Sequence, residues 1–227
     1  MEPRQNDSRN DPRSDPRYIV VEGVIGVGKT SLVNILAERS GGRKVLEVVE
    51  ENPFLSSFYA DKEKYAFQTQ LFFLLSRFRQ QQDLFQQDLF RSLTVSDYLF
   101  AKDRIFATLN LSEDELALYE RVFEALGPRV TKPDLVIYLQ ARLDVLQSRI
   151  KKRGRDFERR IDPGYLERLT RAYNDFFFHY SETPLLVVNT SDIDFVNNPE
   201  DLEGLLAMVR KTRHGTQHYL PAGRQRP

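Results

Sequence analysis

The segment Gly23-Val24-Ile25-Gly26-Val27-Gly28-Lys29-Thr30 decides the fold, because it matches the phosphate-loop pattern G-x-x-x-x-G-K-[ST]. It follows an apolar run over 18–22 that reads as a buried strand. A helix is predicted directly after it, over 31–39. This strand–loop–helix context is the one that the pattern requires, so we interpret the segment as a phosphate-binding loop.

The residue types in this loop suit a nucleoside triphosphate. Glycines let backbone N–H groups turn toward anionic phosphates, and the start of the helix adds a partial positive charge. Lys29 is expected to hold the β- and γ-phosphates, and the Thr30 hydroxyl is expected to ligate Mg²⁺. We therefore predict a triphosphate site that extends from Gly23 to Ser31.

The composition is that of an ordinary globular protein and excludes several functional classes. Hydrophobic residues make up 41% of the 227 residues and charged residues 29%, so a packed core is expected. The 33 basic and 33 acidic side chains cancel, which argues against a nucleic-acid or membrane-surface partner. The sequence has no cysteine and no apolar run that could span a membrane. We expect a cytoplasmic protein.

Apolar runs predict a parallel sheet. Together with 18–22, strands are expected at 45–49, 93–95, 135–139 and 185–188. The runs do not alternate polar with apolar residues, which is typical of strands covered by helices on both faces. The sequence therefore predicts an α/β fold of the P-loop NTPase type, a three-layer sandwich around a five-stranded parallel sheet.

Helices are expected between these strands. Residues 144–153 and 163–180 favour two of them, and long helices should fill most of the stretch from Pro53 to Gly127, whose interior has no glycine or proline. Residues 1–17 mix charges with three prolines, and residues 211–227 have no acidic and few apolar side chains. We predict a folded domain over 18–210 between a disordered N-terminal tail and a flexible C-terminal tail.

Acidic residues lie at the ends of the second and third predicted strands: Glu47 within the second strand, Glu50 and Glu51 just beyond it, and Asp97 at the end of the third. Because the carboxyl ends of parallel strands meet at the edge where the phosphate loop lies, acids there are candidates for metal and base roles. Asp97 ends the third strand and could hold Mg²⁺ with Thr30. A carboxylate at Glu47, Glu50 or Glu51 could accept a proton from a hydroxyl nucleophile, and spacing alone does not decide among the three.

Two further groups of polar residues suggest ligand contacts. Gln70 and Arg77 stand two helical turns apart, and with Asp103 they could read the polar edge of a flat heterocycle; the alternative is three ordinary surface residues. The segment from Arg149 to Arg155 holds five cations and one glycine. We interpret it as a mobile lid whose charges close on a transferring phosphate, although such a run can also be a solvated helix face.

Taken in order, these motifs resemble the deoxynucleoside kinases, and most of all the bacterial deoxyadenosine/deoxyguanosine kinase branch. The likeness covers essentially residues 18–205 and rests on the phosphate loop, Glu47 to Phe54, Tyr59, Gln70 to Arg77, Asp97 to Asp103 and Arg149 to Glu158. It implies phosphorylation of the 5′-hydroxyl of deoxyribonucleosides with ATP and Mg²⁺. It also implies a homodimer with an arginine-rich lid over the site.

The resemblance implies roles around the nucleoside. Glu47 matches the carboxylate that accepts the 5′-hydroxyl proton, with Glu51 as the second choice. Tyr59 and Glu158 match the pair that contacts the sugar 3′-hydroxyl. The three polar residues described above match the family's base-reading trio, from which we expect adenine, guanine or cytosine to be accepted and thymine to be disfavoured.

The resemblance also implies roles around ATP. Arg149 and Arg153 match lid arginines that assist phosphoryl transfer, and Arg153 and Arg155 match those that bind the triphosphate. Asp194 and Phe195, after the last predicted strand, resemble the loop that lies against the adenine of ATP.

One position departs from the family, and it keeps other functions open. The family has Glu-Arg-Ser or Asp-Arg-Ser after the third strand, whereas this chain has Tyr98 after Asp97. Lys102 or Arg104 could supply the missing charge. The alternatives are a nucleoside monophosphate kinase of the thymidylate kinase type and a protein that binds a nucleotide without transferring phosphate.

Overall fold

The structure, a computed structural model, describes residues 15–87, 93–155, 158 and 161–221. In this part of the chain the centre is a six-stranded sheet in the order β2-β3-β1-β4-β5-β6, and all neighbouring strands are parallel. Ile19 of β1, for example, lies opposite Val95 of β3 and Leu135 of β4. The strands are β1 (Tyr18–Gly23), β2 (Arg43–Val45), β3 (Thr94–Ser96), β4 (Leu135–Gln140), β5 (Leu185–Asn189) and β6 (Thr216–Tyr219).

The predicted parallel α/β architecture is confirmed, with a correction to the strand count. The sequence predicts five strands, whereas β6 adds a sixth that pairs with β5. This strand lies in the stretch 211–227 that the sequence predicts as a flexible tail. Its side chains alternate between exposed and half-buried positions, as suits an edge strand, so it has no apolar run to reveal it. Residues 1–14 of the predicted N-terminal tail lie outside the described residues.

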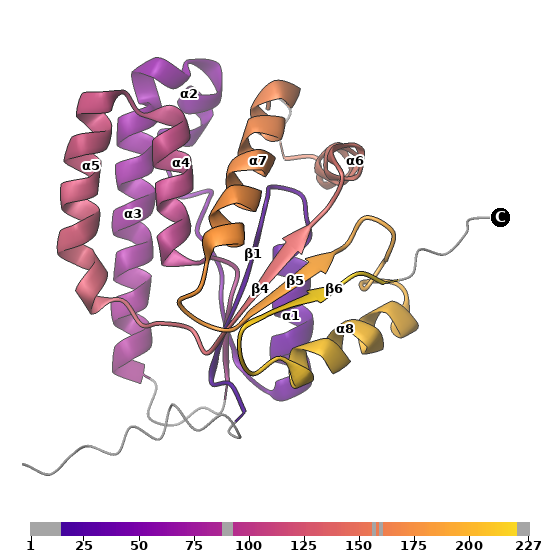
Figure 1. Ribbon diagram of the computed structural model, residues 1–227. Helices are drawn as coiled ribbons and strands as arrows, with labels where there is room; N and C mark the ends of the chain where they lie inside the picture. The colour runs from indigo at the N-terminus through magenta and orange to yellow at the C-terminus, as the bar shows by residue number, and fades with distance from the viewer. Residues whose placement is uncertain (1–14, 88–92, 156–157, 159–160, 222–227) are drawn as a thin grey trace, which may run out of the picture.

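Helices cover both faces of the sheet and form the outer two of the three predicted layers. Figure 1 shows α1 and α8 on one side of the sheet, and α3, α4, α5 and α7 on the other. None of the helices in the described part of the chain combines the length and the apolar character needed to cross a bilayer. The helices are α1 (Lys29–Ser40), α2 (Leu55–Ala60), α3 (Lys62–Gln87), α4 (Asp103–Asn110), α5 (Glu113–Leu126), α6 (Leu143–Arg153), α7 (Pro163–His179) and α8 (Pro199–Lys211), with the 3₁₀ helices η2 (Phe100–Lys102) and η3 (Gly127–Arg129).

The turn from β1 into α1 depends on glycine. All six residues of β1 are buried, so the strand is locked in the middle of the sheet. At its end Gly23 has a φ of 146°, and a Cβ built on it would lie 2.4 Å from the carbonyl oxygen of Leu139 in β4. Gly28, with a φ of 109°, caps the start of α1. Both positions need a residue without a side chain, and this need explains the spacing of the sequence pattern.

The second strand is shorter than the sequence predicts. Residues 45–49 are expected to form it, but β2 ends at Val45 and the chain then leaves the sheet. Glu47 therefore lies in the loop after β2 and not within a strand. Its backbone N–H donates to the carboxylate of Asp97 at 2.6 Å, while the N–H of Asp97 donates to the carbonyl of Val45. These bonds replace sheet pairing and turn Glu47 toward the end of β3.

Candidate active site

A cavity of about 370 Å³ lies at the edge of the sheet where β1, β2 and β3 end. In parallel sheets this is the edge at which ligands bind. One end of the cavity is formed by Lys29 and Thr30 of the phosphate loop, and the other by residues of α3. The walls between them are apolar and contain Leu55, Phe58, Phe73, Phe106 and Tyr165. The cavity can therefore enclose a ligand with a flat apolar body and polar groups at both ends.

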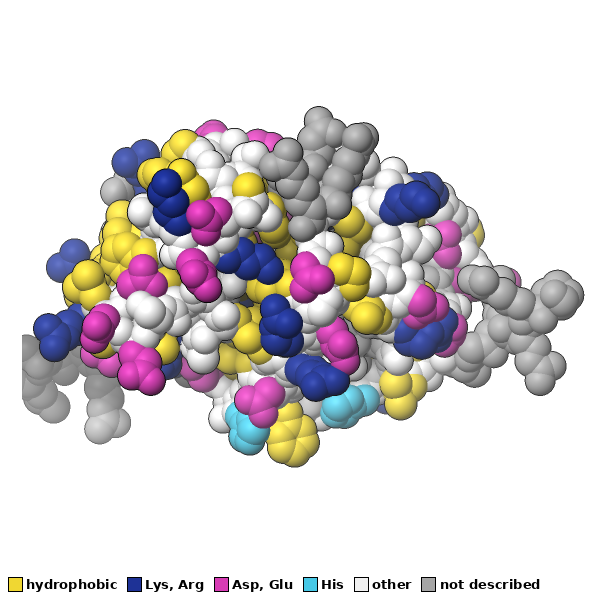
Figure 2. Space-filling model, turned by 90° about the horizontal axis from the view of Figure 1, so that it is seen from above, with side chains coloured by type: hydrophobic (Ala, Val, Ile, Leu, Met, Phe, Trp, Pro, Cys, Tyr) yellow, Lys and Arg dark blue, Asp and Glu magenta, His cyan; other side chains and the backbone are white. Residues whose placement is uncertain are grey.

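The molecular surface carries charges of both signs on the face seen in Figure 2. Lys and Arg side chains gather near the middle of this face, beside acidic side chains and exposed hydrophobic atoms. On such a face individual cations are available to bind a phosphate, but the surface as a whole has no strong potential of one sign. This view agrees with the balanced composition.

Lys29 is held in the phosphate loop by the backbone. Its Nζ donates to the carbonyl oxygen of Gly23 at 2.8 Å. Burial lowers the pKa of Lys29, and the nearby charge of Lys102 lowers it further, while the acids around the site act in the opposite direction. A phosphate would offer this half-buried ammonium a stronger partner than a carbonyl.

Thr30 and Asp97 meet as the sequence predicts. The Thr30 hydroxyl donates to Asp97 Oδ2 at 2.9 Å, and the other carboxylate oxygen of Asp97 accepts from the backbone of Glu47. Burial raises the pKa of Asp97, and the charge of Glu47 adds to this increase. A hydroxyl and a carboxylate side by side are hard oxygen donors of the kind that Mg²⁺ prefers, and a bound cation would favour the ionised carboxylate.

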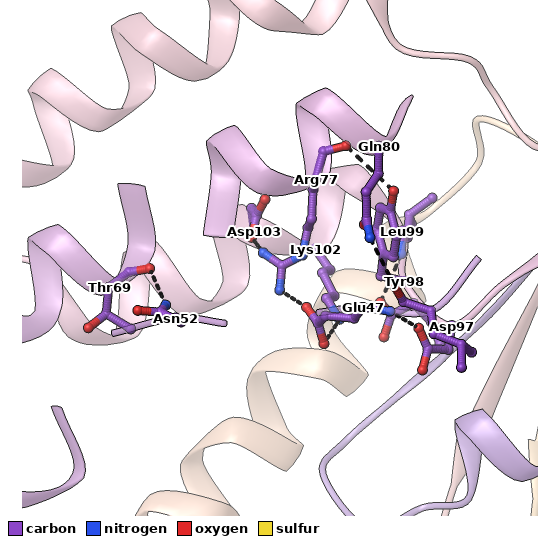
Figure 3. A network of polar contacts seen from close by, with 12 residues as sticks. Glu47, Asn52, Thr69, Arg77, Gln80, Asp97, Tyr98, Leu99, Lys102 and Asp103 are labelled. Carbon is purple, nitrogen blue, oxygen red and sulfur yellow. Dashed lines mark hydrogen bonds and ion pairs between the residues drawn. The ribbon is translucent and has the colours of Figure 1, made fainter. Parts of the chain in front are cut away.

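Figure 3 shows the main charge network of the cavity. The guanidinium of Arg77 lies between the carboxylates of Glu47 and Asp103 and forms an ion pair with each. Lys102 reaches Glu47 from another direction, with Nζ 3.4 Å from Oε2. Burial would raise the pKa of Glu47, but Arg77, Lys102 and Lys29 outweigh it and lower this pKa to about 2. Glu47 is therefore ionised at neutral pH.

The structure separates the three glutamates among which the sequence does not decide. Glu47 lines the cavity and is largely buried within the charge network. Glu50 lies at the cavity wall with a mostly exposed carboxylate, 2.8 Å from a lid arginine, Arg155. Glu51 is exposed and does not line the cavity. Of the three, Glu47 has the position of a group that faces an enclosed hydroxyl.

The base-reading trio is brought together only in part. Gln70 and Arg77 are both buried and line the cavity from one face of α3, as their spacing predicts. Asp103 is fully buried, but it does not line the cavity. It lies behind Arg77 and orients the guanidinium. We expected Asp103 itself to face the base. In the structure, the longer side chain of Arg77 lies between Asp103 and the cavity.

Tyr59 and Glu158 both line the cavity. Burial raises the pKa of the Tyr59 hydroxyl, and the neighbouring Tyr165 and Glu158 raise it further, so this hydroxyl stays protonated. Glu158 is buried and accepts a hydrogen bond from Nε of Arg153 at 3.0 Å. The pair expected around a sugar hydroxyl therefore lines the cavity, and a lid arginine, Arg153, orients Glu158.

The lid arginines occupy two different positions. Arg153 and Arg155 line the cavity, but Arg149 does not. The guanidinium of Arg149 instead donates to the carbonyl of Val27 in the phosphate loop, at 3.1 Å, and to Thr190 after β5. Burial lowers the pKa of Arg149. Residues 156–157 of this segment lie outside the described residues.

The loop expected near the adenine packs against the phosphate loop. Phe195 is buried, and its ring lies 3.1 Å from the point where a Cβ on Gly28 would be. Asp194 accepts hydrogen bonds from the backbone of Val196 and Asn197 and shapes the turn. The structure thus places Phe195 next to the phosphate loop, and Asp194 fixes the turn that carries it.

Two residues near the cavity were not predicted from the sequence to have a role in the site. The sequence suggests Lys102 only as a replacement for a missing arginine, and Glu22 only as the end of a strand. Both are fully buried, and Lys102 Nζ lies 3.1 Å from Glu22 Oε1. The three consecutive charged residues Lys102 to Arg104, within the otherwise apolar stretch from Tyr98 to Ala107, are the signal that could have drawn attention to Lys102.

The fold and the cavity define a class of protein, namely phosphotransferases in which a P-loop opens onto an enclosed acceptor pocket. Comparison with known proteins places the chain within this class. It belongs to the deoxynucleoside kinase family, because the family model described as "Deoxynucleoside kinase" matches residues 19–213. The predicted resemblance is confirmed, and the chain is a nucleotide-using kinase.

The relatives support the same assignment. The chain is 38% identical to a deoxyguanosine kinase of Bacillus subtilis, over 86% of this chain and 96% of that one. It is 32% identical to a deoxyadenosine/deoxycytidine kinase of the same organism, over 88% and 94%. A structure of deoxyadenosine kinase from M. mycoides with bound dATP superposes with a TM-score of 0.74 at 27% identity, over 85% and 98%. Neither alternative function is favoured by these comparisons.

Proposed function

We propose that the protein transfers the γ-phosphoryl group of ATP to the 5′-hydroxyl of a deoxyribonucleoside, as a step of nucleotide salvage. The observation that carries this proposal is the cavity, which is lined by the phosphate loop at one end and by Glu47, Gln70 and Arg77 on the acceptor side. A nucleoside matches this layout, since its hydroxyl end and its base edge lie at opposite ends of an otherwise flat body.

On the donor side, backbone N–H groups of the phosphate loop and Lys29 bind the triphosphate. Thr30 and Asp97 would hold Mg²⁺, which neutralises phosphate charge when bound. Arg153 and Arg155 approach the phosphates from the lid and stabilise the charge that develops during transfer. Arg149 supports the loop from outside through its bond to Val27.

On the acceptor side, Glu47 orients the 5′-hydroxyl and receives its proton. The hydroxyl oxygen attacks the γ-phosphorus, the bond from that phosphorus to the bridging oxygen breaks, and ADP leaves. A carboxylate with a pKa of about 2 is a weak base, so its main contribution is orientation, and it takes the proton late in the transfer. Nucleoside monophosphates are poor acceptors, since Glu47 would repel their phosphate.

Base selection comes from Gln70 and Arg77, with Asp103 holding the arginine in place. Purine bases suit this arrangement, because an amide and a guanidinium can pair with their polar edges. Tyr59 and Glu158 contact the sugar 3′-hydroxyl. Relatives named for deoxyguanosine and for deoxyadenosine/deoxycytidine support this substrate range.

The test is an assay with radiolabelled ATP and Mg²⁺ against the four deoxynucleosides, with dAMP and dTMP as competing acceptors. Deoxyguanosine, deoxyadenosine or deoxycytidine should be converted to its monophosphate, and thymidine poorly. Phosphorylation of dAMP or dTMP alone would contradict the proposal. ATP hydrolysis without transfer would instead support a nucleotide-binding role.

Two further parts of the proposal concern assembly and location. We expect a homodimer through α3 and α5, which lie side by side at one end of the molecule in Figure 1 and expose Leu75 and Leu118. Light scattering should give twice the mass of one chain, and charged substitutions at both leucines should reduce it. A cytoplasmic location stays a prediction, to be tested by cell fractionation.

A further inference from the structure

Lys102 is a buried cation outside the cavity wall. Its side chain is 2% exposed at the end of η2, and it does not line the cavity. An ammonium group is buried at high cost unless carboxylates surround it. The carboxylates here are Glu22 and Glu47, whose oxygens lie 3.1 and 3.4 Å from Nζ.

Glu22 is a rigid anchor for this lysine. It is the penultimate residue of β1 and is fully buried. Its carboxylate accepts hydrogen bonds from the backbone N–H groups of Gly23 at 2.8 Å and Leu99 at 2.9 Å. The Glu22 carboxylate is therefore bonded both to the first residue of the phosphate loop and to the chain after β3. Lys102 pairs with this fixed carboxylate and with Glu47, which lies on a loop outside the sheet.

Among the residues that the structure describes, the other positions weighed for this charge do not link Glu22 to Glu47. Tyr98, at the position where the resemblance leads us to expect an arginine, is fully buried and carries no charge. Arg104 points away, with a half-exposed guanidinium that pairs with Glu120 at 2.9 Å. Arg77 does reach Glu47, but it shares its charge with Asp103 and lies on the base side.

We propose that Lys102 is a positioning residue for phosphoryl transfer. Its ammonium is paired with Glu22 and fixes the position of the Glu47 carboxylate relative to the phosphate loop. The acceptor hydroxyl that Glu47 binds is thereby aligned with the donor phosphate. The inference rests on the proposed function, and in particular on the role of Glu47. A lysine that served only to neutralise Glu22 would leave the transfer step untouched once Glu22 was also made neutral.

A variant that lacks both charges distinguishes positioning of Glu47 from simple neutralisation of Glu22. The double variant Glu22→Gln, Lys102→Met removes both charges, so neither is left buried and unpaired. Single-turnover rates with ATP and deoxyguanosine should fall about 10²-fold, as expected for a misplaced reacting group, while the KM values for both substrates change little. The variant Lys102→Arg, with Glu22 intact, should recover most of the rate. Arg104→Met is the matched control and should behave like the wild type.

The outcomes separate the two proposals. A double variant that transfers phosphate at the wild-type rate would overturn the role of Lys102 while leaving the kinase function intact. A wild-type protein that phosphorylates none of the four deoxynucleosides would overturn the proposed function itself. If thermal unfolding shows that the double variant is not folded, Lys102→Gln, whose amide can still donate to Glu22, replaces it in the same comparison and with the same expected loss.

Discussion

The two ends of the cavity are built in different ways. The phosphate-loop end is one continuous segment from Gly23 to Thr30, in which glycines set the backbone and, under the proposed function, backbone N–H groups bind the triphosphate. The acceptor end joins Glu47, Arg77 and Lys102 from three separate segments, and ion pairs between side chains hold it together. A backbone turn can thus be specified locally, whereas a charge network exists only after the segments have packed.

The largest expected effect is at the locally specified end. Lys29→Ala removes a cation directed at the γ-phosphate, and kcat should fall about 10²–10³-fold, as for loss of a preorganised donor. The free energy of unfolding should change little, because burial already disfavours the charged form of this lysine. Steady-state kinetics and thermal unfolding measure both, with exposed Lys44→Ala as the control. Near-normal turnover would exclude this loop as the catalytic site.

Glu47→Gln should affect both activity and stability, since the acceptor end depends on charge. We expect kcat to fall about 10²-fold, at the low end for a general base, with ATP binding unchanged. If Glu51→Gln is instead the inactive variant, the choice between the two residues is wrong.

The same variant tests the pH dependence of stability. The pKa of Glu47 falls from 4.5 to about 2 on folding, so its contribution is present above pH 4.5 and is lost as the pH falls toward 2. This contribution amounts to about 3 kcal/mol. Chemical unfolding between pH 5 and 2 should show a steeper loss of stability for the wild type than for Glu47→Gln.

Selectivity for the base should change when the Arg77–Asp103 pair is removed. In Arg77→Met, Asp103→Leu no charge is left buried and unpaired, and the preference for deoxyadenosine over thymidine should drop about tenfold or more, within the about 1–3 kcal/mol of an unsatisfied polar group. The ratio of kcat/KM values is the measurement, because a general loss of rate cancels in it. An unchanged ratio, or a wild type that prefers thymidine, would remove this pair from the base site.

The smallest effect is expected at the lid. Glu50 and Arg155 form an ion pair in which both side chains are partly exposed. Glu50→Gln should therefore change the free energy of unfolding by less than about 1 kcal/mol. The KM for ATP should fall slightly, because Arg155 no longer pairs with the Glu50 carboxylate and is more available to the phosphates of ATP. A rise in this KM would show that Glu50 helps to place the arginine for ATP.

Prediction from the sequence succeeds where the signal is local and fails where it is not. The buried strands and the phosphate loop are found from apolar runs and glycine spacing, but β6 is missed because an edge strand needs no apolar run. Gln70 and Arg77 share a helix face and are placed correctly by periodicity. Asp103 belongs to another helix, so its depth behind Arg77 cannot be read from spacing.

The sequence by itself determined the parallel α/β class, the phosphate loop and the kinase family, because each depends on residue types at short, regular spacing. Only the tertiary structure decided which of the three glutamates line the cavity, that Lys102 and not Arg104 contacts Glu47, and that Asp103 pairs with Arg77 behind the cavity wall. The physical reason is that electrostatic roles depend on distance and burial between side chains. Those quantities arise when separate segments pack, and no segment encodes them alone.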